Sequence, residues 1–219
     1  MRKLIAIIPT LNEQKGLPFV IRELKAGGAD GVVVVDGHST DSTVRVAKQL
    51  GASVIFQKGR GKGMAFRTFV RKYPIRSDDF YVMIDGDASY SGHEISKFRS
   101  ALERSDVVFG NRGILVHDVR SLIHVLGGLA ISLFGSLLFL RYNPDICSGY
   151  VGFRGNALKK LALRSRTFTL EANIFAESAK KGLSMSLVSV SYRRREGVSK
   201  LTLFDGPKIV LALLRERFL

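Results

Sequence analysis

Two aspartates separated by one glycine, Asp85-Gly86-Asp87, are the residues of this chain best suited to chemistry. They follow the apolar run 80–84, which is typical of a buried strand in a parallel sheet. Side chains two positions apart on a strand point the same way, so both carboxylates can face one site. Two such anions repel unless a cation joins them, and carboxylate oxygens suit Mg²⁺ or Mn²⁺. Gly86 lets another group approach the backbone closely. The alternative is an ordinary turn, because Asp-Gly is a common turn dipeptide.

Apolar runs alternate with amphipathic segments through the first half of the chain and would position these aspartates. We expect strands near 4–8, 31–35, 52–56, 80–84 and 105–110, with helices near 16–26, up to 50, near 59–73 and near 93–103. This alternation predicts an α/β fold with a parallel, doubly wound sheet. Ligands of such sheets bind outside the carboxyl ends of the strands, where Asp85 and Asp87 fall.

Two other polar segments lie at expected strand ends. Asp36 follows the second strand and could bind a ribose or base, or Asp36 and Ser39 could simply build the loop. Gly61-Lys62-Gly63 opens a helix, where backbone N–H groups and the lysine could hold an anion. The chain has neither the P-loop spacing nor G-x-G-x-x-G after the first strand, which argues against an ATPase and a nicotinamide enzyme.

Charge and composition limit the class of partner. The chain has 219 residues, a length that suits one domain. Its single cysteine, Cys147, excludes an internal disulfide. Its net charge is +15. The positive charge implies nucleic acid, a membrane surface or a phosphorylated substrate as partner. The clustered aromatics of a nucleic-acid stacking platform are absent from the sequence. The apolar run 4–8 is too short for a signal peptide.

Several short motifs occur in a fixed order along nearly the whole chain. They are Pro9-Thr10-Leu11-Asn12-Glu13, Asp36-Gly37-x-Ser39-x-Asp41-x-Thr43, Gly61-Lys62-Gly63-x-Ala65, Asp85-Gly86-Asp87, Gly110-Asn111-Arg112, Asp145-x-x-Ser148-Gly149-Tyr150-x-x-Phe153-Arg154 and Arg195-x-Gly197-x-Ser199-Lys200-Leu201. Together they resemble the family 2 glycosyltransferases. The last three resemble the polyprenyl-phosphate sugar synthases, chiefly the dolichyl-phosphate mannose and glucose synthases.

This resemblance implies a GT-A fold, with a mostly parallel sheet and a nucleotide-sugar site at the strand ends. It also implies transfer of a hexose, with inversion, from GDP-mannose or UDP-glucose to a polyprenyl or dolichyl phosphate. Mannose is the favoured sugar, and Mg²⁺ or Mn²⁺ is the expected cofactor. Transfer to another glycan or lipid acceptor is the alternative within the class. A non-enzymatic basic module that binds membrane or nucleic acid is the alternative outside it.

The resemblance further implies a role for each matching residue. The nucleotide would be held by Pro9, Thr10, Asn12, Glu13 and Asp36. The metal would be held by Asp85 and Asp87, with Ser89 at the position where mannose synthases often have a glutamine. The catalytic residues would be Asp87, Arg112 and Arg195. Further substrate contacts would come from Ser39, Lys62, Gly86, Arg120, Asp145, Ser148, Arg154, Glu171 and Lys200.

The second half contains a strongly apolar stretch, 122–140, which as a helix would be about 28 Å long. A membrane span would place the Asp85 and Asp145 motifs on opposite sides of the bilayer, so we reject it. We expect a helix over about 120–141 that either packs in the core or lies at a membrane interface with Arg120 and Arg141 at its ends. A helix over 169–181, a strand over 184–192 and a short amphipathic helix over about 206–218 complete one catalytic domain, 1–219. We expect it in the cytoplasm, peripherally on the cytoplasmic face of the membrane, with no nucleic acid partner.

Overall fold

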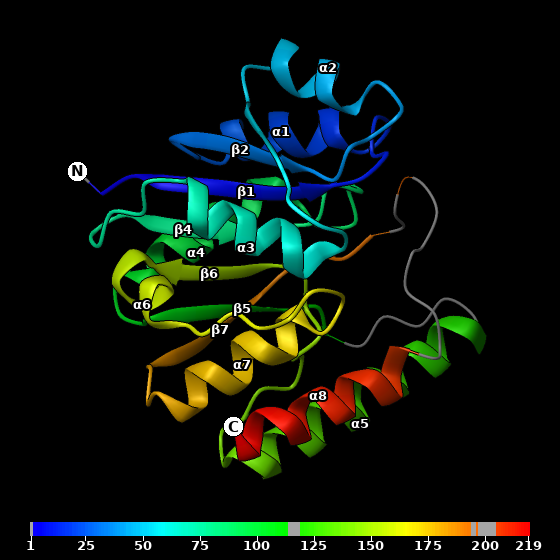
Figure 1. Cartoon of the computed structure of the whole chain (residues 1–219), viewed down its shortest axis with the longest axis vertical. Coiled ribbons are helices and arrows are strands. Elements are labelled where there is room, and N and C mark those ends of the chain that lie inside the picture. The colour runs from blue at the N-terminus through cyan, green and yellow to red at the C-terminus, as the bar shows by residue number, and fades with distance from the viewer. Residues whose placement is uncertain (1, 114–118, 194–195, 197–204) are drawn as a thin grey trace.

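The computed structural model describes residues 2–113, 119–193, 196 and 205–219, and within 119–124 only the backbone. Seven strands form one sheet in the order β3-β2-β1-β4-β6-β5-β7, with helices on both of its faces (Figure 1). The strands are β1 Leu4–Thr10, β2 Gly31–Asp36, β3 Ser53–Phe56, β4 Phe80–Met83, β5 Val107–Asn111, β6 Val151–Arg154 and β7 Met185–Ser189. The helices are α1 Leu17–Ala26, α2 Thr43–Gln49, α3 Lys62–Lys72, α4 Ile95–Leu102, preceded by the 3₁₀ turn η1 Gly92–Glu94, α5 Val119–Phe139, α6 Gly155–Lys160, α7 Leu170–Lys180 and α8 Asp205–Phe218.

The prediction of a doubly wound, mostly parallel α/β sheet is confirmed. β1 pairs in parallel with β2 and β4, β2 with β3, and β5 with β7. Among the described strands only β6 departs, because it lies antiparallel between β4 and β5. β6 therefore begins, rather than ends, at the sheet edge where the parallel strands end.

Strand β1 shows how the sequence builds two cores. Its side chains alternate, so that Ile5 and Ile7 pack on one face of the sheet and Leu4, Ala6 and Ile8 on the other. The first face is covered by α3, α6, α7 and α8, and the second by α1, α2 and α4. A sheet buried on both faces accounts for the nearly continuous apolar runs of its central strands.

The register of the strands brings the chemical residues to one edge. Thr10, the last residue of β1, lies opposite Asp36, the last residue of β2. Ile7 of β1 lies opposite Met83, so Asp85 and Asp87 follow at the same edge. This is the carboxyl edge of the parallel strands, where the sequence predicts the site.

Helix α8 is joined to the rest of the fold through a buried carboxylate, Glu216. Its Oε1 accepts a hydrogen bond of 2.9 Å from Asn173 Nδ2 of α7, and its Oε2 lies 3.1 Å from Arg164 Nη1. The same arginine nitrogen is 3.0 Å from Glu177 Oε1 of α7. Asn173 Oδ1 in turn accepts the backbone N–H groups of Arg164 and Ser165. Glu216 thus connects α8 both to α7 and to the loop before α7.

The apolar stretch forms helix α5, as predicted. One flank packs against α7 and α8, with Ile131, Phe134 and Leu138 in contact with the core. No helix in the described ranges combines the length and the apolar character needed to cross a membrane.

Candidate active site

The loop after β4 holds the two aspartates in a defined geometry. Asp87 is buried, and its Oδ1 accepts hydrogen bonds from the Ser89 hydroxyl and, at 3.0 Å, from the Ser89 backbone N–H. Ala88 between them has a φ of 60°, a left-handed conformation that costs a non-glycine residue about 1–2 kcal/mol. This turn folds Ser89 back onto Asp87, so Ser89 is placed to orient the carboxylate. Gly86 lies against Thr10 and Ile8, where a Cβ would be crowded at 3.1 and 3.2 Å.

Asp85 is part of a buried ion cluster that crosses the sheet edge. Lys62 Nζ, at the start of α3, lies 2.5 Å from Asp85 Oδ1 and 2.6 Å from Glu171 Oε1, in the first turn of α7. Burial disfavours the ammonium, but the two carboxylates outweigh it and raise the pKa of Lys62. Burial, with Asp85 nearby, raises the pKa of Glu171 although Lys62 opposes it. All three residues are sequence-predicted site residues, and the fold brings them together.

Gly149 closes this cluster from the loop before β6. A Cβ at this position would overlap the Asp85 carboxylate and lie 3.0 Å from Lys62 Nζ, so only glycine fits. The Gly149 N–H donates a 2.9 Å hydrogen bond to the Tyr90 hydroxyl oxygen. Ser148 is fully buried, 3.4 Å from the same tyrosine oxygen. This placement makes Ser148 a support of the loop.

Arg112, at the end of β5, is held in place by Asp145. Its Nε and Nη2 lie 2.8 and 2.6 Å from the two oxygens of Asp145, and its backbone N–H donates to Oδ2 at 3.1 Å. The guanidinium also lies over the ring of Tyr192, 5.2 Å from the centroid, an arrangement that favours a cation. Tyr192 forms an antiparallel bridge with Tyr90. The aspartate loop, β5 and the segment after β7 therefore meet around one arginine.

The other half of the edge is a hydrogen-bonded loop pair after β1 and β2. Asp36 Oδ2 accepts from Thr10 Oγ1 at 3.2 Å and from Ser39 Oγ at 2.6 Å. Ser39 Oγ also accepts the Asn12 N–H at 2.8 Å, and Asn12 Oδ1 accepts the Thr40 N–H at 2.9 Å. The resulting edge collects the predicted nucleotide residues Pro9, Thr10, Asn12, Glu13, Asp36 and Ser39.

A divalent metal would find two carboxylates here. Among the described residues no group of three or more His, Cys, Asp or Glu side chains gathers to hold a metal ion. Asp85 and Asp87 nevertheless fit Mg²⁺ or Mn²⁺, which proteins often bind through one or two carboxylates together with substrate phosphates. Ser89 is almost fully buried and donates to Asp87, so it fits better as a support of that ligand than as a ligand itself.

The family follows from the sequence match. Residues 5–161 match Glycosyl transferase family 2. The chain belongs to this family. Glycosyltransferase AglJ of Haloferax volcanii is 32% identical, with 95% of this chain and 70% of that protein covered. The dolichyl-phosphate hexose transferase of Haloferax volcanii is 29% identical (98% and 95% covered), and the undecaprenyl-phosphate mannosyltransferase of Micrococcus luteus is 27% identical (91% and 88% covered).

A solved structure supports the fold of this glycosyltransferase. The glucosyl-3-phosphoglycerate synthase of Mycobacterium tuberculosis, in complex with Mn²⁺, uridine diphosphate and glucosyl-3-phosphoglycerate, matches with a TM-score of 0.79 at 22% identity. The match covers 99% of this chain and 80% of that one. The GT-A fold expected from the motifs is therefore confirmed.

One site prediction of this glycosyltransferase is wrong. Arg154 lies at the opposite edge of the sheet, because β6 is antiparallel and pairs Arg154 with Phe80, the first residue of β4. Its Nε donates to the Leu102 carbonyl at 2.6 Å and its Nη2 to the Glu103 carbonyl, so it stabilises the end of α4.

Three other predicted residues fall outside what the structure describes. Arg195 and Lys200 are not among the described residues, and of Arg120 only the backbone is described. Arg193, two residues before Arg195, is ion-paired with Glu23 of α1 at 2.7 Å. Its backbone N–H donates to the Ser89 carbonyl at 2.8 Å, so the chain after β7 does run beside the aspartate loop.

Sequence reasoning missed three residues that shape the site. Tyr192 lies against the Arg112 guanidinium, Tyr90 packs against Tyr192, and Gly149 contacts Asp85. Two signals were available: Tyr90 is a large side chain three residues after Asp87, and Gly149 belongs to the motif that begins at Asp145.

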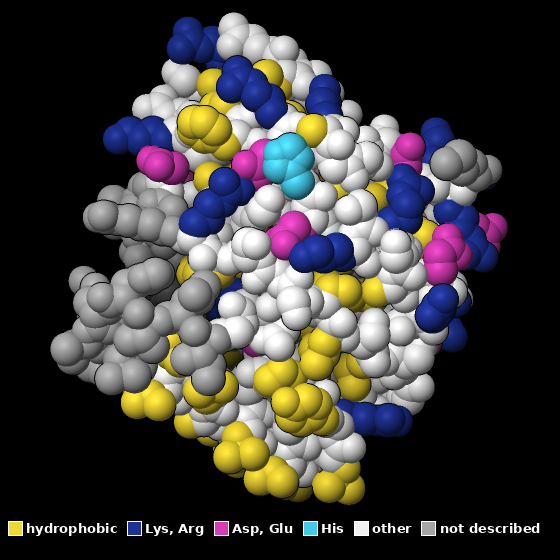
Figure 2. Space-filling view, turned by 180° about the vertical axis from the view of Figure 1, so that it is seen from behind, with side chains coloured by type: hydrophobic (Ala, Val, Ile, Leu, Met, Phe, Trp, Pro, Cys, Tyr) yellow, Lys and Arg dark blue, Asp and Glu magenta, His cyan; other side chains and the backbone are white. Residues whose placement is uncertain are grey.

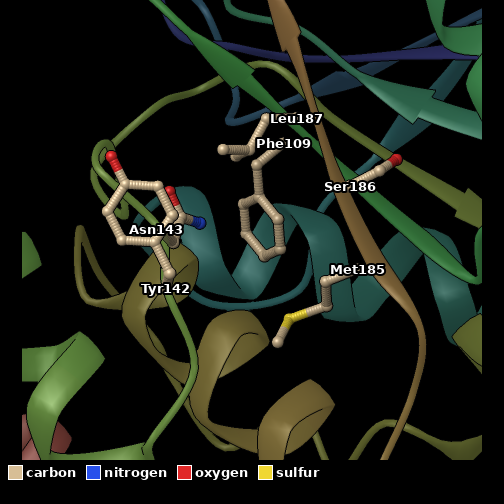
Figure 3. Close-up of a pocket in the computed structure, with 6 residues that line it drawn as sticks. All are labelled: Phe109, Tyr142, Asn143, Met185, Ser186 and Leu187. Atoms are coloured by element: carbon tan, nitrogen blue, oxygen red, sulfur yellow. The ribbon is translucent and has the colours of Figure 1, made fainter.

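The described residues also line a small cavity of about 20 Å³, enough for one water molecule. Figure 3 shows that it lies between β5, β7 and the loop after α5, and its lining contains none of the predicted site residues: Phe109, Tyr142, Asn143, Met185, Ser186 and Leu187.

Proposed function

We propose that this glycosyltransferase moves a hexose from a nucleotide sugar to a polyprenyl phosphate, with inversion at the anomeric carbon. The observation that carries the proposal is that the Asp85-Gly86-Asp87 loop lies at the same sheet edge as Asp36. Arg112, which is ion-paired with Asp145, lies near Tyr90, at the end of that loop. Relatives named as dolichyl-phosphate hexose transferase and undecaprenyl-phosphate mannosyltransferase match over almost their whole lengths and support the choice of acceptor. Mannose is the first sugar to test.

The nucleotide would lie over the β1–β2 edge, on Asp36 and the loop residues bonded to it. Asp85 and Asp87 would hold Mg²⁺ or Mn²⁺, which when bound neutralises the leaving diphosphate. The acceptor is a phosphate monoester whose second pKa is about 6, so it is already an anion near neutral pH and needs no general base. Arg112 would position that phosphate by charge-assisted hydrogen bonds, since Asp145 and Tyr192 fix the guanidinium plane. Arg195 would share this task.

The acceptor's lipid tail implies contact with a membrane, and α5 supplies a suitable surface. Residues 125–139 contain no charged side chain, and leucines recur on one exposed stripe: Leu126, Leu133, Leu137 and Leu140 are 57, 63, 66 and 85% exposed. Figure 2 shows hydrophobic side chains gathered along the lower edge of the molecule, over α5. An apolar helix stripe open to solvent is typical of interfacial binding. We infer that the enzyme sits peripherally on the cytoplasmic face of the membrane.

Vesicle flotation tests the membrane contact. The double variant Leu133→Ser/Leu137→Ser should leave most of the protein in the bottom fraction, because it removes two exposed apolar side chains from the stripe. Phe19→Ser is the matched control, since Phe19 is 54% exposed on α1 and lies outside the stripe. Equal flotation of the double variant and the wild type would argue against docking through α5.

A turnover assay tests the transfer itself. Dolichyl phosphate is incubated with Mg²⁺ or Mn²⁺ and GDP-mannose or UDP-glucose in separate reactions, with UDP-N-acetylglucosamine as a third donor because a Methanococcus voltae relative is named for that sugar. Radiolabelled sugar in the lipid phase from one donor identifies the reaction. Asp87→Ala should abolish transfer with the circular dichroism spectrum unchanged. Retained activity would refute the metal role. Donor binding without lipid product would favour a different glycan or lipid acceptor.

A further inference from the structure

Lys62 is a buried cation with two anionic partners. Its ammonium lies 2.5 Å from an oxygen of Asp85 and 2.6 Å from an oxygen of Glu171, and its side chain is only 13% exposed. The partners come from the end of β4 and the first turn of α7, so one lysine joins three elements. The motif alone led us to expect that Lys62 binds an anion of the substrate. The structure instead commits its charge to two carboxylates of the protein.

Without this ammonium the Asp85 and Glu171 carboxylates would face each other with no cation between them. One oxygen of each lies within 2.6 Å of Lys62 Nζ, and the side chains are 31% and 8% exposed. Two carboxylates that close repel each other unless a cation lies between them. Hard oxygen ligands in this arrangement bind Mg²⁺ or Mn²⁺. The lysine therefore occupies the place that a divalent ion would take.

The surroundings keep Asp85 in this arrangement. Its Oδ2 lies against Gly149, whose missing side chain leaves just enough room for the carboxylate. Gly61 and Gly63, on either side of Lys62, lie against the carbonyl oxygens of Arg166 and Ser165, where any Cβ would be too close. The first turn of α3 is thus fixed by the loop before α7, and the lysine is directed at the two carboxylates.

We propose that Lys62 is a positioning residue that serves as a built-in cation: it joins Asp85 to Glu171 and excludes a divalent metal from that pair. Asp85 then meets the metal that it holds with Asp87 through a carboxylate whose orientation Lys62 fixes. The proposal rests on the proposed metal-dependent transfer and adds a residue that fixes the orientation of one of the two metal-binding aspartates. The proposed role of Lys62 can be distinguished from that of a structural salt bridge, because the loss of a structural salt bridge would not change the number of bound metal ions.

Counting bound Mn²⁺ by electron paramagnetic resonance, with the metal alone as probe, tests this role. Wild type should bind at most one Mn²⁺ per chain. Lys62→Met should bind one more than wild type, because the freed carboxylates take an ion. Lys62→Met/Glu171→Gln should return to the wild-type number, since one carboxylate is gone. Lys72→Met, an exposed lysine at the far end of α3, is the matched control and should not change the count.

The outcomes separate this inference from the proposed function. A folded Lys62→Met that binds the same number of Mn²⁺ as wild type, or a wild type that binds two, would overturn the inference. If Lys62→Met does not fold in metal-free buffer, millimolar Mn²⁺ should restore its fold, and failure to do so while the double variant folds would also overturn it. Absence of sugar transfer by wild type from every donor would instead refute the proposed function and leave the metal counts standing.

Discussion

Replacement of Asp145 by asparagine should destabilise the protein through Arg112. The carboxylate accepts three hydrogen bonds from this arginine, two of them from the guanidinium at 2.8 and 2.6 Å, and both side chains are less than one-third exposed. Asparagine offers a single oxygen and directs its NH₂ group at a donor. One charge-assisted hydrogen bond contributes about 1.5–3 kcal/mol, and breaking a buried ion pair costs about 3–5 kcal/mol. We therefore expect a loss of about 3 kcal/mol in the free energy of unfolding.

Thermal unfolding followed by circular dichroism measures this loss. A chain of this length loses about 2–4 °C in Tm per kcal/mol, so Asp145→Asn should lower Tm by about 6–12 °C. Glu103→Gln is the control, because the Glu103–Arg2 pair is about half exposed at both ends and should contribute less than about 1 kcal/mol. A double-mutant cycle with Arg112→Gln isolates the pair. A Tm shift no larger than that of Glu103→Gln would refute the reasoning.

Three further variants test other parts of the site and fold. Gly149→Ala should reduce transfer by at least about tenfold without unfolding the protein, because the new methyl group overlaps the Asp85 carboxylate; a turnover assay measures it, and unchanged activity would contradict the close contact. Tyr90→Phe should cost about 1–3 kcal/mol in urea unfolding, since the buried Gly149 N–H loses its acceptor, and an unchanged midpoint would argue against that hydrogen bond. Burial opposes the ionisation of Glu177, but hydrogen bonds from the Ala162 N–H, Arg164 and Lys180 outweigh it and lower its pKa. The lowered pKa stabilises the fold fully above the unfolded value of about 4.3 and is lost as the pH falls through the folded pKa, so Tm measured against pH should show the gap between wild type and Glu177→Gln closing in acid.

The fold could largely be predicted from the sequence, because its elements carry local signals. The apolar runs and the amphipathic segments between them indicated every parallel strand and most helices within a few residues. The direction of β6 could not be predicted. Its four residues, Val151–Arg154, form strand pairs on both sides, and their direction is decided by distant partners in β4 and β5. That one reversal accounts for the misplacement of Arg154.

Candidate site residues could be predicted where the residue type and its position at a strand end indicate the chemistry. They could not be predicted where their role depends on an ion-pair partner that is distant in the sequence. Asp85, Asp87 and Asp36 could be located because carboxylates at strand ends are unusual and the strands are recognisable. The partners of Lys62 could not be foreseen, since Glu171 is more than a hundred residues away and no local pattern couples them. The same holds for Arg112 and Asp145, which lie 33 positions apart.

Helix α8 is an integral part of the fold, because the Glu216 side chain connects it to residues that support the candidate site. Glu216 bonds to Asn173, Asn173 holds the loop at Arg164 and Ser165, and the carbonyls of that loop lie against the first turn of α3. A chain shortened before Glu216 would take one acceptor from the Asn173 amide and one from the Arg164 guanidinium, and would loosen the loop beside Lys62. Elements joined in this way open together, so the amides of α7 and α8 should exchange with solvent as one cooperative unit. A tag or fusion that disturbs α8 should therefore also disturb the sheet edge that carries Lys62 and Asp85.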